Sequence, residues 1–170
     1  MTTNDVSTSA HGFAPKAPND ATKFLDGTAA FSQPASSYLP DTLSADTTAK
    51  GIIVTKTAGE NLAFGDVVYF KSDGKAWKAD ANAASAYPAT GMALGTINSS
   101  ASGNILLIGV VRNDAWNWTI GGVIYLSTTA GSLTQTQPSA TDDVIQVLGV
   151  AHPNADTMYF RPSLDYITHT

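Results

Sequence analysis

Short apolar runs separated by turn residues dominate the chain from Gly51 onward. The first run, Gly51-Ile52-Ile53-Val54-Thr55, is β-branched and bounded by polar residues, which is typical of a strand. Asp73-Gly74 joins the run 66–70 to the run 76–79, and an Asp-Gly pair in that position favours a hairpin because both residues tolerate a positive φ. Further strands are expected at 91–97, 105–112, 123–127, 132–135, 144–151 and 157–161. This spacing predicts an all-β domain, a small β-barrel or sandwich.

One segment departs from the strand pattern. Residues 80–86 begin with Asp80 and are rich in alanine, a composition that favours a helix with a capped start. Pro88 follows closely and limits its length. No other segment shows a clear helical preference.

A weak internal repeat runs through the same region. The segment 62–70 aligns with 118–126, so that Gly121 lies 56 residues after Gly65. A second pair of segments, 91–94 and 149–152, is related by 58 residues. Because the two offsets nearly agree, we predict two similar halves that share one strand–hairpin–strand arrangement. The two halves would pack into a single pseudo-symmetric barrel.

The first 50 residues differ from the rest of the chain in the spacing of their apolar residues and in their prolines. Their apolar residues follow no sustained period, and their prolines remove backbone donors and favour extended conformations in the preceding residues. The aromatics and leucines are too widely spaced for a core and too numerous for a plain linker. Two interpretations remain, a floppy tail or an extended arm whose aromatics bind pockets of a neighbouring subunit, and we favour the arm. We therefore divide the chain into an N-terminal anchoring arm, 1–50, and a β domain, 51–170.

Composition narrows the classes of function. Charged residues make up 14% of the 170 and the formal net charge is −5, whereas a nucleic-acid binder needs clustered Lys and Arg. No apolar run approaches the ~20 residues of a membrane span. The N-terminus lacks the basic start and apolar core of a signal peptide, so we expect synthesis in the cytoplasm. The absence of cysteine excludes disulfides, thiolate metal sites and cysteine nucleophiles.

Candidate catalytic chemistry is sparse. The closest constellation is His152 with Asp156 across a turn, where a hydrogen bond of the turn is favoured over a catalytic or metal-supporting pair. His11 and His169 have no partner at ligand-like spacing, and Asp142-Asp143 reads as a turn rather than a cation loop. Glu60 is the only glutamate, and nucleophile-elbow, Walker, dinucleotide and zincin motifs are absent. We expect no enzyme activity, no metal site and no cofactor.

Aromatic residues near the C-terminal half are the remaining candidates. Trp116 and Trp118 alternate, which would place both on one face of a strand. Such a pair can stack on a sugar ring in a receptor-binding module, or it can close one end of the barrel or lie in a subunit interface. The area that each Trp buries favours the structural role. Tyr159 and Phe160 face opposite sides of the last strand, so at least one belongs to the core.

Two pieces of the chain resemble proteins of bacteriophage particles. Residues 11–27 run His-Gly, then Pro-Lys, then Thr-Lys-Phe-Leu and Gly, similar to a segment of phage tail fibres and head fibres. Phe31 and Pro34 fill its closing positions, although the usual second Gly and a Trp are missing. Residues 65–70, 73–75, 79–81, 121–126 and 147–151 resemble small β modules of capsid decoration or cement proteins and fibre ends.

The resemblance implies a β-barrel-like module, often a homotrimer, with no catalytic residues to carry over. The leading hypothesis is a structural protein that decorates or cements the phage capsid as a head fibre or decoration protein, on the outer surface of the virion. Its partners would be the major capsid protein and itself, with neither nucleic acid nor membrane. The residues expected to anchor it to capsid or subunit are His11, Phe13, Pro15, Lys16, Phe24, Leu25, Phe31 and Tyr38. The alternative is a short tail fibre or receptor-binding tip that recognises a host surface glycan through Trp116 and Trp118; an enzyme such as a small hydrolase is the third.

Overall fold

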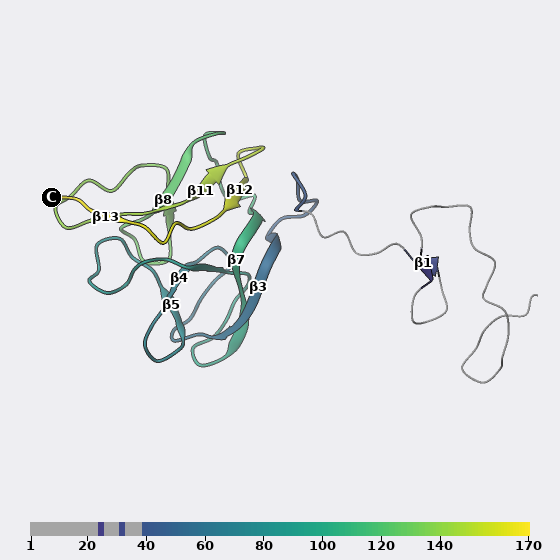
Figure 1. The fold of residues 1–170 in the computed structure, drawn as a ribbon, viewed down its shortest axis with the longest axis horizontal. Coiled ribbons are helices and arrows are strands. Elements are labelled where there is room, and N and C mark those ends of the chain that lie inside the picture. The colour runs from purple at the N-terminus through teal and green to yellow at the C-terminus, as the bar shows by residue number, and fades with distance from the viewer. Residues whose placement is uncertain (1–23, 26–30, 33–38) are drawn as a thin grey trace, which may run out of the picture. The chain divides into compact units, whose positions relative to one another are not determined.

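The computed structural model describes residues 24–25, 31–32 and 39–170 (Figure 1). Contacts along the chain separate residues 1–38 from Leu39–Thr170, and we call the second unit the body. In the first unit, β1 (Phe24–Leu25) pairs antiparallel with β2 (Phe31–Ser32). The body consists of strands and turns, without a helix among its described residues. The all-β prediction is therefore confirmed.

Eleven strands make up the body. The predicted strands are present with different bounds: 91–97 is a strand over Gly91–Ala93 with an isolated bridge from Ile97 to Leu62, 132–135 is a strand over Leu133–Thr134, and 144–151 divides into two strands. Their bounds are β3 Thr48–Thr57, β4 Val67–Phe70, β5 Ala76–Lys78, β6 Gly91–Ala93, β7 Ser102–Arg112, β8 Val123–Leu126, β9 Leu133–Thr134, β10 Val144–Ile145, β11 Val147–Ala151, β12 Thr157–Phe160 and β13 Ile167–Thr168.

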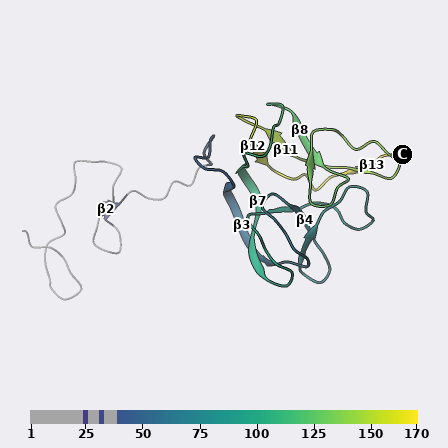
Figure 2. The same ribbon diagram turned by 180° about the vertical axis from the view of Figure 1, so that it is seen from behind.

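The long strand β7 organises a curled, nine-stranded antiparallel sheet. β3 lies along one edge of β7 over its whole length, and both views show the two strands side by side (Figures 1 and 2). On its other edge β7 pairs first with β6 and then with β12. The sheet continues as β5-β4-β6 on one side and β12-β11-β8-β9 on the other. A separate small sheet pairs β10 with β13.

This strand order confirms the internal repeat. Reading outward from the centre, β7, β6, β4 and β5 correspond to β12, β11, β8 and β9. The turns that lead into β4 and β8 use glycines at positive φ, 89° for Gly65 and 77° for Gly121, a conformation that glycine adopts without steric cost. Four backbone hydrogen bonds of the first half recur in the second half at the offsets of the repeat. Written from the N–H donor to the C=O acceptor, with the equivalent bond in brackets, they are Gly65 to Ala93 (Gly121 to Ala151), Asp66 to Ala63 (Gly122 to Thr119), Ala93 to Asp66 (Ala151 to Gly122) and Leu62 to Ile97 (Trp118 to Ala155).

The core of the body forms two hydrophobic clusters. The larger is built around Met92, Leu106, Ile124, Leu148 and Phe160, all without solvent exposure, and it spans both halves of the repeat. The smaller lies under β4 and β6 of the first half. Phe160 is fully buried while Tyr159 is only partly so, as the alternation of the last strand predicts. Because one core serves both halves, they fold as a single unit.

The predicted helix over 80–86 is wrong. These residues form turns, in which the Asp80 N–H donates to Ala86 O and the Ala86 N–H donates to Ala83 O. Ala79 and Ala81 are fully buried, and the Ala81 N–H donates to Ser127 O in the other half. Of the alanines in 80–86 only Ala81 is fully buried. Its hydrogen bond to the other half, together with the turn hydrogen bonds, overrides alanine's intrinsic helical preference.

Both predicted Asp turns are confirmed. Gly74 has φ 76°, and the Lys75 N–H donates to Asp73 Oδ1 at 2.9 Å. This backbone hydrogen bond, with a further one from the Trp77 indole, lowers the pKa of Asp73 below its usual value. At the second turn Asp142 has φ 70°, and Asp143 accepts the Ala140 N–H at 3.1 Å.

Candidate functional site

Trp116 and Trp118 lie in the loop between β7 and β8, so their placement on a strand is wrong. β7 ends because Asn113 forms a side-chain-stabilised turn: its Oδ1 accepts the Ala115 N–H at 3.0 Å and its backbone oxygen accepts the Trp116 N–H. The two indoles nevertheless meet, with ring centroids 5.6 Å apart and planes tilted by 47°. The turn thus brings together two rings that the alternating pattern places on one face.

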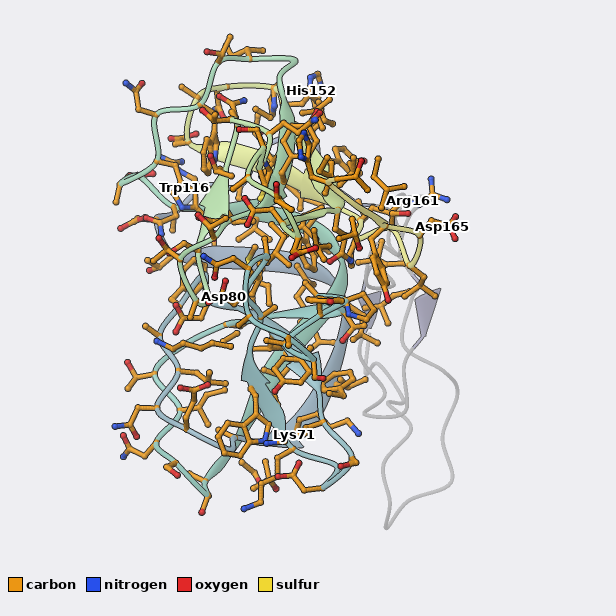
Figure 3. All side chains as sticks on the ribbon, turned by 90° about the vertical axis from the view of Figure 1, so that its left-hand side faces the viewer. Lys71, Asp80, Trp116, His152, Arg161 and Asp165 are labelled. Atoms are coloured by element: carbon orange, nitrogen blue, oxygen red, sulfur yellow. The ribbon has the colours of Figure 1, made fainter. Side chains whose placement is uncertain are left out.

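The two rings form one wall of a pocket. Both are half-buried and pack against the larger core cluster, while their remaining surface is open. The cavity has a volume of about 250 Å³, and we call it the Trp pocket. Figure 3 shows Trp116 at the periphery of the body. The pocket is lined by Phe64, Gly65 and Asp66 before β4, by Trp116 and Trp118, and by Gly131, Ser132 and Leu133 at the start of β9.

Asp66 is the charged residue of the Trp pocket. Its Oδ2 accepts the Ala63 N–H at 2.8 Å and lies 3.1 Å from the Lys78 ammonium nitrogen. Because Lys78 neutralises the carboxylate, the pocket presents hydrogen-bonding atoms without a net charge. Gly131 lies beside the same carboxylate: a Cβ there would be 2.9 Å from Asp66 Oδ1, so only a glycine places no side chain against this oxygen.

A second hollow, of about 280 Å³, includes Thr134 of β9 in its lining. Hydroxyl side chains such as Thr128, Thr134 and Ser139 dominate its lining, and it contains no aromatic residue. Its acid, Asp143, is 6% exposed and its carboxylate is used to hold the Ala140 turn. The hollow therefore lacks a platform for stacking, and we do not treat it as the site.

Residues 39–47, which we call the neck, are the first segment of the body; they lead into β3 and contact the rest of the body through side chains. His152 Nε2 lies 3.1 Å from Asp41 Oδ1 in the neck. Asp156 instead lies 3.3 Å from Arg112 Nε and accepts the Thr157 hydroxyl at 2.9 Å. The predicted His152–Asp156 pair is thus wrong, because tertiary packing supplies each residue with a different partner. His152 and Lys71 lie at opposite ends of the body (Figure 3).

Arg112 at the end of β7 is the main neck contact. Its Nη1 donates to Leu43 O at 2.8 Å, and its Nε donates to Asp114 Oδ1 at 2.6 Å. The hydrogen bond with Asp114 raises the pKa of the Arg112 guanidinium above its usual value. Asp114 in turn donates its N–H to Asp46 Oδ1 at 2.7 Å. The end of β7 therefore fixes the position of the neck against the rest of the body.

Arg112→Met should release the neck while the body stays folded. The variant keeps the aliphatic stem but loses the donors to Leu43 and Asp114, so cleavage of the neck by a broad-specificity protease should accelerate about tenfold, as expected for ~1.4 kcal/mol of lost local protection. Limited proteolysis with mass spectrometry measures this. Arg161→Met, an exposed arginine outside these contacts, is the control. Equal cleavage rates for both variants would show that Arg112 does not hold the neck.

The residues predicted to anchor the protein lie mostly outside the described residues. His11, Phe13, Pro15, Lys16 and Tyr38 fall in segments that the structure does not describe, and Phe24, Leu25 and Phe31 are described only as paired backbone in β1 and β2. Sequence reasoning missed Phe64, Asp66 and Gly131 as partners of the Trp pair. The repeat includes Phe64 and Asp66, because it aligns 62–70 with 118–126, but no sequence signal indicated Gly131.

Comparison with protein-family models, with curated proteins and with solved structures returned no match. In the part of the chain that the structure describes, no group of three or more His, Asp or Glu side chains is arranged to hold a metal ion. The same residues include no helix long and apolar enough to cross a membrane.

Proposed function

We propose that this chain is a structural protein of a bacteriophage virion, which attaches to the capsid through its N-terminal residues and displays the body on the outer surface. The observation that carries the proposal is the division of the chain between residues 38 and 39. The segment that resembles phage fibre proteins, 11–27, falls entirely in the first unit. The body is a separate unit with its own core, as a displayed module requires.

The surface of the body suits contact with a protein shell. β3 has its strand partner, β7, on one edge only among the described residues. Ile52 on β3 and its register partner Ile108 on β7 are 59% and 41% exposed, and this exposed apolar pair suits an interaction surface. Charged residues are few, so such contacts depend little on salt. These features suit contact with another protein surface. The major capsid protein and further copies of the chain, in a homotrimer, are proposed as partners from the resemblance to phage proteins.

Deleting residues 1–35 should abolish binding to capsids and leave the body folded. The deletion removes the proposed attachment segment but none of the contacts of the neck, which begin at Asp41. Co-sedimentation with purified capsids that lack the protein measures binding, and thermal unfolding followed by circular dichroism checks the fold. The full-length chain is the control. Retention of full binding by the truncated protein would exclude the anchoring role.

A short tail fibre or receptor-binding tip is the second candidate function, and the open Trp pocket favours it. A recognition module needs an exposed site with aromatic and polar groups, and the two half-buried indoles beside Asp66 supply one. Immunogold labelling of virions with an antibody against residues 51–170 separates the two functions. Gold over the head supports decoration, and gold confined to the end of the tail supports the receptor-binding tip.

A further inference from the structure

The internal repeat provides a reference for the Trp pocket. Trp118 donates its backbone N–H to Ala155 O as Leu62 donates to Ile97 O, so the two residues hold equivalent positions in the two halves. Leu62 is 2% exposed and belongs to the smaller core cluster. The fold therefore accepts a leucine at this position of the repeat, and the strand order does not require a tryptophan there.

Unlike Leu62, Trp118 keeps part of its side-chain surface exposed. It is half-buried, contacts the Trp116 ring and contributes its remaining surface to the pocket. Its indole N–H is buried and has no hydrogen-bond partner among the described residues, a cost that a leucine would avoid. The second half therefore keeps an aromatic pair although an unpaired indole N–H destabilises the fold, and the first half has no such pair. A ligand that contacts the two rings explains this difference.

From this asymmetry and the pocket chemistry we propose that the Trp pocket binds a single neutral pyranose ring. The apolar face of the sugar stacks on Trp116 and Trp118, and Asp66 Oδ1 accepts a hydrogen bond from a sugar hydroxyl. The biological role of such binding rests on the display of the body at the particle surface that is proposed above. The binding itself depends on the pocket alone.

The charges around the pocket select a neutral ligand. Asp66 Oδ2 accepts the Ala63 N–H and pairs with Lys78, whereas Oδ1 accepts no hydrogen bond from a described residue and has no side chain of residue 131 against it. The ion pair leaves no net charge to attract a cation or an anion. A hydroxyl group suits the remaining acceptor, because it can donate to a carboxylate and carries no charge of its own.

The size of the pocket limits the ligand to about one ring. Its volume of about 250 Å³ is below the ~300–1,000 Å³ of pockets for drug-sized ligands. Tilted aromatic rings also dock proline-rich peptides, and residues 11–27 of another copy supply such a segment. The free carboxylate oxygen favours the hydroxylated ligand, and the peptide is kept as an outcome of the test.

The test titrates the full-length protein with methyl glycosides of glucose, galactose, mannose and N-acetylglucosamine, and with glucosamine and sialic acid as charged probes. Saturation-transfer NMR reports contact of the sugar ring, and Trp fluorescence reports affinity. We expect saturable millimolar binding of at least one neutral glycoside, weakened at least tenfold by Trp118→Leu. Trp77→Leu, at the β4–β5 hairpin outside the pocket, is the matched control and should bind normally.

Trp118→Leu should fold, because leucine occupies the equivalent position of the other half; Trp116→Leu serves as the second variant if it does not. The proposal is overturned if no neutral glycoside binds, if both pocket variants bind as well as the control, or if the charged probes bind best. It is also overturned if a synthetic peptide of residues 11–27 saturates the pocket in place of the sugar. If the protein binds a sugar but immunogold labelling finds no protein on the virion, the sugar site is supported and the display function is excluded.

Discussion

Gln146→Leu is expected to lower the free energy of unfolding by about 2–6 kcal/mol. It leaves the buried N–H and C=O groups of Ala89 without a hydrogen-bond partner, at ~1–3 kcal/mol each. Gln146 is fully buried, and its Oε1 accepts the Ala89 N–H at 2.8 Å. Its Nε2 donates to Ala89 O at 2.8 Å and to Ser163 O at 2.6 Å. One side chain thus joins the segment before β6 to the segment after β12, and leucine fills the volume without replacing any of the three bonds.

Urea unfolding followed by Trp fluorescence measures this loss. Gln137→Leu is the matched control, because Gln137 is exposed and the same substitution there should change stability by less than about 0.5 kcal/mol. If the two variants unfold at the same urea concentration, the polar link through Gln146 does not stabilise the fold. A loss limited to the region of Ala89 would be visible as faster hydrogen exchange there.

Gly109→Ala should separate β3 from β7. A Cβ at Gly109 would lie 2.3 Å from Lys50 O and 2.9 Å from Gly51 Cα, and neither backbone atom can move without moving β3. Overpacking of this kind costs about 1–3 kcal/mol, occasionally more. We expect fast amide exchange throughout Thr48–Thr57 and retained protection in β8 and β11, because those strands pair away from β3.

Hydrogen-exchange mass spectrometry follows each strand separately. Gly95→Ala is the control, since nothing lies within 4 Å of the added methyl group there. Protection of β3 at the level of the unmodified protein in Gly109→Ala would contradict the close approach of Gly51 and Gly109. Because β3 follows the neck directly, the same variant also tests whether the entry of the chain into the body depends on this pair of strands.

Local signals in the sequence determined the fold class and most of the strands. β-branched runs such as 51–55 and the Asp73-Gly74 turn specify their conformation through neighbouring residues, and the structure has both. The repeat was also detectable, because equivalent turns need the same glycine at 65 and 121. The prediction of an arm that anchors the protein to a phage particle depends on the resemblance of residues 11–27 and stays a prediction.

Only the tertiary structure decided what surrounds each side chain. Residues 80–86 form turns instead of a helix because Ala81 is buried and its N–H bonds to Ser127 in the other half. His152 contacts Asp41, 111 positions away, rather than Asp156. The Trp pocket required three loops to converge, which placed Phe64, Asp66 and Gly131 beside Trp116 and Trp118. Strand formation depends on near neighbours along the chain, whereas a pocket depends on which distant segments the packing of the sheet brings together.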